Sequence, residues 1–150
     1  MTNRQKVMSG REDREQIEKT LAGFIRDFND LDLDKVSTYF AEDATIFPRV
    51  VMSGGDAGDI DLSHYLREEG PGPDSSMREF ARERKAGTSG PPYMKLEPRD
   101  VMIQLHGEVA VVTFHLLVRH RLSRRTLVLL RRDAAWKIIH LHASNVHGGC

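Results

Sequence analysis

The feature that most constrains the fold is a series of four apolar, β-branched runs in the last third of the chain. The runs cover residues 94–107, 108–121, 124–132 and 135–145 and are separated only by short polar turns. Val, Ile, Thr and aromatic side chains at this density favour strands over helices. Turns this short join antiparallel neighbours, because a parallel pair needs a long crossover. We therefore predict a sheet with three consecutive antiparallel pairings.

The first part of the chain has the spacing of helices instead. Apolar side chains between residues 17 and 28 recur on one helical face, which predicts a helix over residues 12–30. Glu12 and Asp13 would lie in its first turn, where negative charge suits the helix dipole. Asp32 can cap a second, shorter helix that ends near the "AEDA" of residues 41–44.

The middle of the chain is less regular. Residues 44–51 alternate like a strand, in which Pro48 indicates an edge or a bulge. Residues 53–75 are rich in Gly, Asp, Ser and Pro and form a long excursion, whereas residues 75–87 have the apolar spacing and terminal Gly of a third helix. Helices followed by a meandering sheet give an α+β fold, in which a curved sheet wraps around the helices.

Length and composition limit the classes of protein. The 150 residues suit one domain, which we place at residues 11–146, with a mobile N-terminus at 1–10 and a tail at 147–150. Lys and Arg total 22, as do Asp and Glu, so no net charge attracts nucleic acid or a membrane surface. The single cysteine, Cys150, leaves no internal disulfide, and no segment has the length of a membrane span. We expect a soluble, cytoplasmic protein.

The order of the predicted elements resembles that of the nuclear transport factor two-like superfamily over nearly the whole chain. The "FAEDA" after the second helix is one shared feature. The end of the chain, "RRDAAWKIIHLHASN", is similar to the terminal strand of the SnoaL-like and calcium/calmodulin-dependent kinase association-domain branch. The matching positions are Arg131, Arg132, Asp133, Trp136, Ile138, His140, His142 and Ser144.

The resemblance implies a cone: N-terminal helices packed in a strongly curved, mostly antiparallel sheet. It also implies a homodimer formed through the outer face of the sheet and a pocket between sheet and helices. It does not imply one activity, because this fold hosts isomerases, dehydratases, cyclases, binding modules and oligomerisation domains.

His140 and His142 raise the question of a metal site. By strict alternation they share one face of the last strand with Trp136, Ile138 and Ser144. Two such imidazoles could bind a metal if a neighbouring strand supplied a third ligand. We favour packing or interface histidines, because no cysteine or carboxylate of ligand spacing accompanies them. The sequence predicts no metal and no cofactor.

His115 is the strongest pocket candidate, because it interrupts an apolar run where a polar side chain needs a partner or a wet cavity. It shares its side of the strand with a more polar set of residues than the alternate positions do, so we predict that it faces the interior of the cone. A histidine there could also act as an acid or base. The other candidates for ligand binding are Tyr39, Arg49, Arg119 and Asn145.

Three functional hypotheses follow. The first is a homodimeric domain that binds a small hydrophobic or polar organic molecule, with or without acid–base chemistry such as isomerisation, dehydration or cyclisation. The second is a non-catalytic dimerisation or assembly module. The third, a metal-dependent enzyme, rests only on His140 and His142. No matched set of catalytic residues identifies a reaction.

Overall fold

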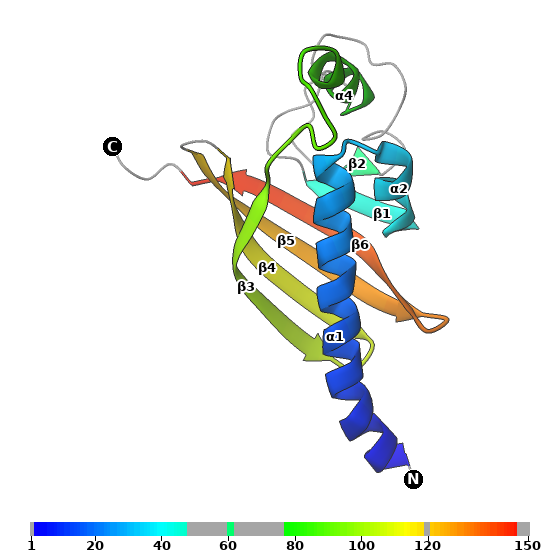
Figure 1. Ribbon diagram of the computed structural model, residues 1–150. Helices are drawn as coiled ribbons and strands as arrows, with labels where there is room; N and C mark the ends of the chain where they lie inside the picture. The colour runs from blue at the N-terminus through cyan, green and yellow to red at the C-terminus, as the bar shows by residue number, and fades with distance from the viewer. Residues whose placement is uncertain (1, 48–59, 62–76, 119–120, 147–150) are drawn as a thin grey trace.

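The computed structural model describes residues 2–47, 60–61, 77–118 and 121–146 (Figure 1). A long helix and a broad curved sheet make up most of this part of the chain. The elements are α1 (Thr2–Asn29), α2 (Leu33–Thr38), β1 (Phe40–Phe47), β2 (Ile60–Asp61), α4 (Met77–Ala86), β3 (Glu97–His106), β4 (Val109–Val118), β5 (Arg121–Arg132) and β6 (Ala135–Asn145).

The strands form one mixed sheet in the order β2-β1-β6-β5-β4-β3. The three antiparallel pairings predicted from the C-terminal runs, β3 with β4, β4 with β5 and β5 with β6, are confirmed. β1 adds to β6 in parallel, and β2 pairs antiparallel with β1. The α+β class and the mostly antiparallel curved sheet are therefore confirmed as well.

The core lies between α1 and the concave face of the sheet, which α1 crosses (Figure 1). α1 contributes the apolar stripe that the sequence predicted, including Ile17 and Phe24. Alternate residues of the strands meet this stripe, because successive side chains of a strand point to opposite faces. From β4, β5 and β6 these are Ala110, Val112, Phe114, Leu116, Leu127, Leu129, Ile138, Leu141 and Ala143.

α1 begins at Thr2, ten residues before the predicted start. The extra turns have no apolar stripe to bury, but they contain Arg, Gln, Lys and Met, which have high helix propensity. One consequence is that Asp13 is not in the first turn and does not serve the helix dipole. Its side chain is buried instead, where it has another partner.

The second helix is shorter than predicted. Its cap is confirmed, since the Asp32 carboxylate accepts a hydrogen bond from the Lys35 amide at 3.2 Å. The prediction that it ends near residues 41–44 is wrong, because Phe40 already pairs with Ile138 of β6 and opens strand β1. Parallel pairing of the apolar "FA" segment with β6 stabilises a strand there more than the helical pattern stabilises a longer α2.

The other predictions for the middle of the chain have mixed outcomes. The third helix is confirmed as α4, at the end of which the Gly87 amide bonds to the Glu83 carbonyl. Pro48, with the end of the strand predicted at 44–51, lies outside the described residues. So does most of the excursion at 53–75, of which the structure describes only the two residues of β2.

A β-bulge in β6 reverses the faces predicted for its histidines. Ile138 pairs with Leu129 and His140 with Val128, so Ile139 is an extra residue on β6. Before the bulge, Trp136 and Ile138 face the core, and after it Leu141 does. The prediction that His140 and His142 share the face of Trp136 is therefore wrong, because strict alternation holds only in an unbroken ladder.

Candidate ligand-binding hollow

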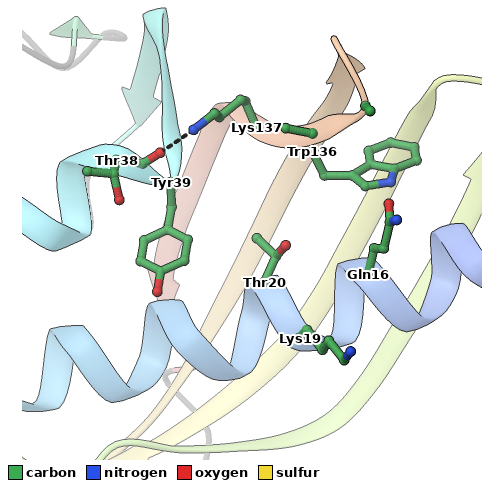
Figure 2. Close-up of a pocket in the computed structure, with 9 residues that line it drawn as sticks. Gln16, Lys19, Thr20, Thr38, Tyr39, Trp136 and Lys137 are labelled. Carbon is green, nitrogen blue, oxygen red and sulfur yellow. Dashed lines mark hydrogen bonds between the residues drawn. The ribbon is translucent and has the colours of Figure 1, made fainter.

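A hollow of about 390 Å³ opens between α1 and the start of β6, beside the junction of α2 and β1 (Figure 2). It forms where β6 extends past the first residue of β1, so that no strand of the described residues pairs with the first residues of β6 on the β1 side. Its volume is within the range of small-molecule sites. The lining residues are Gln16, Lys19, Thr20, Thr38, Tyr39, Ala134, Ala135, Trp136 and Lys137.

Tyr39 forms one wall of the hollow and is held by a buried carboxylate. Its ring crosses toward α1 (Figure 2), and its hydroxyl donates a hydrogen bond of 2.6 Å to Asp27. Gly23 makes room for this approach: a Cβ at that position would lie 2.6 Å from the Tyr39 hydroxyl oxygen. Asp27 also accepts a 3.3 Å bond from the exposed guanidinium of Arg26.

The pKa values in this cluster are displaced in opposite directions. Burial acts to raise the pKa of the Asp27 carboxyl, but the hydrogen bonds from Tyr39 and Arg26, together with nearby positive charge, lower it below its ordinary value. Burial, and then the bond to Asp27, raise the pKa of the Tyr39 phenol. Asp27 is therefore ionised and Tyr39 protonated at neutral pH, and the phenol proton is directed at Asp27.

Trp136, at the opposite wall, is fixed by a second buried carboxylate. Arg131 donates from Nη1 to both oxygens of Asp13, at 2.8 and 2.9 Å, and the Trp136 indole N–H donates to Asp13 at 3.3 Å. The Arg131 guanidinium also lies 5.9 Å from the centre of the indole ring. This cluster joins α1 to the β5–β6 hairpin and sets the orientation of the indole.

The remaining polar groups of the hollow differ in their partners. Lys137 reaches across to the Thr38 carbonyl and donates a 2.6 Å hydrogen bond (Figure 2). By contrast, no hydrogen bond or ion pair to the side chain of Gln16, Lys19 or Thr20 comes from any described residue. These three side chains are therefore available to a ligand.

Of the residues that the sequence analysis predicted for ligand binding, the structure places only some at the hollow. Tyr39 lines the hollow. Asn145 lies opposite Ser123, a buried residue, so it is on the helix-bearing side of the sheet but at the other end of β6 from the hollow. Arg49 and Arg119 lie outside the described residues.

The prediction that His115 faces the interior of the cone is wrong. Phe114 and Leu116, its neighbours along β4, are buried in the core, so His115 is on the outer face. It is half-exposed there, with Nδ1 3.0 Å from the Asp100 carboxylate. The more polar alternate set that suggested a pocket wall is the outer surface of the sheet, which no described helix covers (Figure 1).

His140 and His142 also lie on this outer face. His140 Nδ1 is 2.7 Å from the Thr45 hydroxyl, and the His142 ring meets Phe47 edge-on at 5.3 Å. In the part of the chain that the structure describes, no three His, Cys, Asp or Glu side chains cluster as a metal would require. The absence of a bound metal stays a prediction, which elemental analysis of untagged protein would test.

Sequence reasoning missed Asp13 and Asp27, the two buried acids that fix the walls of the hollow. A signal was present: both acids border the apolar stripe of α1, where a charged residue needs a partner. Arg125 was also missed as an inward residue. It pairs with the buried Phe114 and Ala143, and its side chain is therefore on the helix-bearing face of the sheet.

Comparison with protein families gives one match: a model described as "SnoaL-like domain" matches residues 64–147, more than half of the chain. No curated protein sequence matches significantly. The helices of the described residues include none long and apolar enough to cross a membrane.

Several solved structures share the fold. A protein from Novosphingobium aromaticivorans, described as NTF2-like with a cystatin-like fold, is 17% identical, with a TM-score of 0.61 and coverage of 100% of this chain and 92% of that one. An NTF2-like protein of unknown function from Pseudomonas putida is 16% identical (TM-score 0.60; 87% and 84%). The CaMKII hub of S. rosetta is 15% identical (TM-score 0.59; 88% and 95%). At these identities the likeness shows the cone-shaped α+β fold alone.

Proposed function

The chain belongs to the SnoaL-like family, and from that premise we propose that it binds a small polar organic molecule in the hollow between α1 and β6. The observation that carries this proposal is the pair of buried carboxylates behind the hollow. Asp27 and Asp13 hold Tyr39 and Trp136 as fixed walls. Walls fixed before binding spare the ligand the entropic cost of ordering them.

Binding is better supported than turnover at this site. The Tyr39 hydroxyl donates to Asp27, so its proton is not available to a substrate. Asp27 does not line the hollow, and the lining residues include no carboxylate and no histidine. General acid–base catalysis needs such a group within hydrogen-bond reach of the reacting proton. The acid–base chemistry of isomerases and dehydratases therefore has no support from this hollow.

The single tryptophan of the chain provides the test. Trp136 lines the hollow, so its indole N–H resonance is one resolvable signal at the site. We expect a screen of small polar molecules to give hits that shift this resonance. Thr20→Met should weaken those hits at least about fivefold, because the longer side chain fills the hollow while keeping good helix propensity. Ala22→Met, an exposed position of α1 outside the lining, is the matched control. Equal weakening by both variants, or none by either, would exclude the hollow.

We further propose a homodimer formed through the outer face of the sheet. One cross-strand row on this face runs from Phe47 through His142, Thr126 and Thr113 to Met102. Phe47 and Met102 are 42% and 61% exposed, which is unusual for large apolar side chains. A sheet face that presents exposed apolar side chains and that no described helix covers is the kind of surface that a second copy buries. The fold similarity to a protein described as a CaMKII hub keeps the assembly hypothesis as the second candidate function.

Thr126→Arg tests the dimer. Thr126 is at the middle of the row, on the central strand β5, where a guanidinium would be trapped unpaired between two sheets but solvated in a monomer. Light scattering at micromolar concentration should give the mass of two chains for the wild type and of one chain for this variant. The control is Thr88→Arg at an exposed loop position. A monomeric wild-type protein would contradict the proposal.

A cytoplasmic location also stays a proposal. It is supported by the single cysteine in 150 residues, which leaves no intramolecular disulfide of the kind common in oxidising compartments.

A further inference from the structure

We propose that the ligand of the hollow is an organic anion: an apolar, preferably ring-shaped body that carries one carboxylate or phosphate group. This inference rests on the proposed function, because it names the chemical class that the same site would bind. It depends on the charges around the hollow and on the division of its lining into polar and apolar parts.

Two lysines are among the lining residues, Lys19 on α1 and Lys137 on β6. In Figure 2 the Lys137 ammonium is turned to the Thr38 carbonyl, and the Lys19 side chain lies along α1. Neither has a carboxylate within 4.0 Å among the described residues; Lys137 contacts only the Thr38 carbonyl. By contrast, the guanidinium of Arg131 is paired with the carboxylate of Asp13. Two unneutralised positive charges on one concave surface raise the local concentration of anions, even in a chain of net charge zero.

Acidic residues near the hollow do not cancel this charge. The lining contains no Asp or Glu. Glu12 and Glu15 are one turn away from Gln16 and Lys19 along α1, but both are exposed and outside the lining. Asp27 is behind Tyr39, where its charge is paired with the Arg26 guanidinium and it accepts a hydrogen bond from the Tyr39 hydroxyl. The charged residues among the lining are therefore both cationic.

The uncharged residues of the lining indicate what the rest of the ligand should be. The Gln16 amide and the Thr20 hydroxyl can hydrogen-bond to an acid group that is attracted by the positive charge of either lysine. Beyond them the surface is apolar, formed by the Trp136 indole, the Tyr39 ring and the methyl groups of Ala134 and Ala135. A flat ring with one charged group matches this division, whereas a bare inorganic anion would leave the apolar part uncovered.

The test compares probes that share a phenyl ring and carry either an anionic or a neutral group. Benzoate, phenyl phosphate and the neutral benzamide are titrated into ¹⁵N-labelled wild-type protein while the Trp136 indole resonance is followed. Probes of this size bind with dissociation constants of about 1–10 mM at ordinary ligand efficiency. We expect benzoate and phenyl phosphate to bind at least about tenfold more tightly than benzamide, and inorganic phosphate to bind more weakly than phenyl phosphate. A higher salt concentration should weaken the binding of the anionic probes only.

Variants assign the effect to the two lysines. Lys19→Gln and Lys137→Gln should each weaken benzoate about three- to tenfold and leave benzamide unchanged, since one charge contact is removed. Lys95→Gln removes an exposed charge that is not part of the lining and should change nothing. Lys19→Arg, which restores the charge, should bind benzoate nearly as the wild type does.

The outcomes separate this inference from the proposed function. If benzamide binds as tightly as benzoate and Thr20→Met weakens both, the hollow is a binding site but the anionic class is wrong. If no probe moves the indole resonance at a concentration about 20-fold above a dissociation constant of about 10 mM, the inference is overturned. If benzoate binds but neither glutamine variant weakens it, the lysines are not its partners and the inference fails as well.

Discussion

Replacing Asp13 by Ala is expected to destabilise the protein by about 3 kcal/mol, because it removes the buried carboxylate of an ion pair and leaves Arg131 with only a 4.0 Å contact to Glu108. Asp13 is 6% exposed and accepts from both Arg131 and the Trp136 indole. In a chain of this length the midpoint of thermal unfolding should fall by roughly 6–12 °C. Urea denaturation and calorimetry would measure the two values.

Two further variants separate the charge from the hydrogen bonds. Asp13→Asn keeps an oxygen that can accept from Trp136 but loses the charge that pairs with Arg131, so its cost should be intermediate. Glu12→Ala removes an exposed acid from the adjacent position of α1 and should cost less than about 0.5 kcal/mol. If Asp13→Ala costs no more than Glu12→Ala, the cluster does not stabilise the fold.

A double-mutant cycle would show that Asp13 acts through Arg131. In an Arg131→Met background the guanidinium is absent, so Asp13→Ala should cost at least about 1 kcal/mol less than it does in the wild type. Additive costs would mean that the two side chains contribute independently, despite the 2.8 Å contact between them.

The sheet could be predicted from sequence because its information is local. Each run after Tyr93 has strand composition, and the short turns between runs leave only antiparallel neighbours. The parallel addition of β1 to β6 joins Phe40 to Ile138, almost a hundred residues apart, and no local pattern encodes such a pairing. For the same reason the prediction placed the "FAEDA" segment at the end of a helix, where the structure has a strand.

The faces of the sheet were harder to predict than its order. Alternation assigns side chains correctly only while the ladder is regular, and one extra residue at Ile139 moved both histidines of β6 to the outer face. On β4 the alternation was regular, but the wrong set was assigned to the interior. The four residues that face α1, Ala110, Val112, Phe114 and Leu116, are all apolar, and the half-polar set around His115 is half-buried on the outer face.

The hollow itself was beyond sequence reasoning, because its walls come from three separate segments. Tyr39 was a pocket candidate, but its partner Asp27 belongs to another helix, and the distance between them depends on Gly23. A glycine in a helix interior normally costs about 1 kcal/mol relative to alanine, which indicates a packing reason for its presence. Here that reason is the Tyr39 hydroxyl.

Gly23→Ala is accordingly expected to destabilise the protein by about 1–2 kcal/mol, although the same change in an unobstructed helix would stabilise it. The new Cβ would be 2.6 Å from the Tyr39 oxygen, so the phenol must leave Asp27. A hydrogen bond to a charged group contributes about 1.5–3 kcal/mol, which exceeds the gain of about 1 kcal/mol in helix propensity. Asp27 would retain only the exposed Arg26.

In a Tyr39→Phe background, the sign of the stability change caused by Gly23→Ala should reverse. Without the hydroxyl, the nearest ring atom is 3.3 Å from the Cβ position, a tight contact that a small shift of the ring relieves. Gly23→Ala should then be neutral or stabilising by up to about 1 kcal/mol. If Gly23→Ala is equally destabilising with and without the hydroxyl, the clash lies elsewhere in the helix packing.

Acid provides a second readout of the same contact. The pKa of Asp27 in the folded protein is lower than its ordinary value, so the stability that its ionised form contributes is complete above the unfolded-state value of about 3.9 and is lost as the pH falls through the folded-state value. The stability difference between the wild type and Gly23→Ala, measured by urea denaturation, should be constant from pH 7 to about pH 5 and shrink below that. A difference that persists unchanged into strong acid would show that the variant acts by steric strain alone, and that the ionised Asp27 is not what holds Tyr39 at the wall of the hollow.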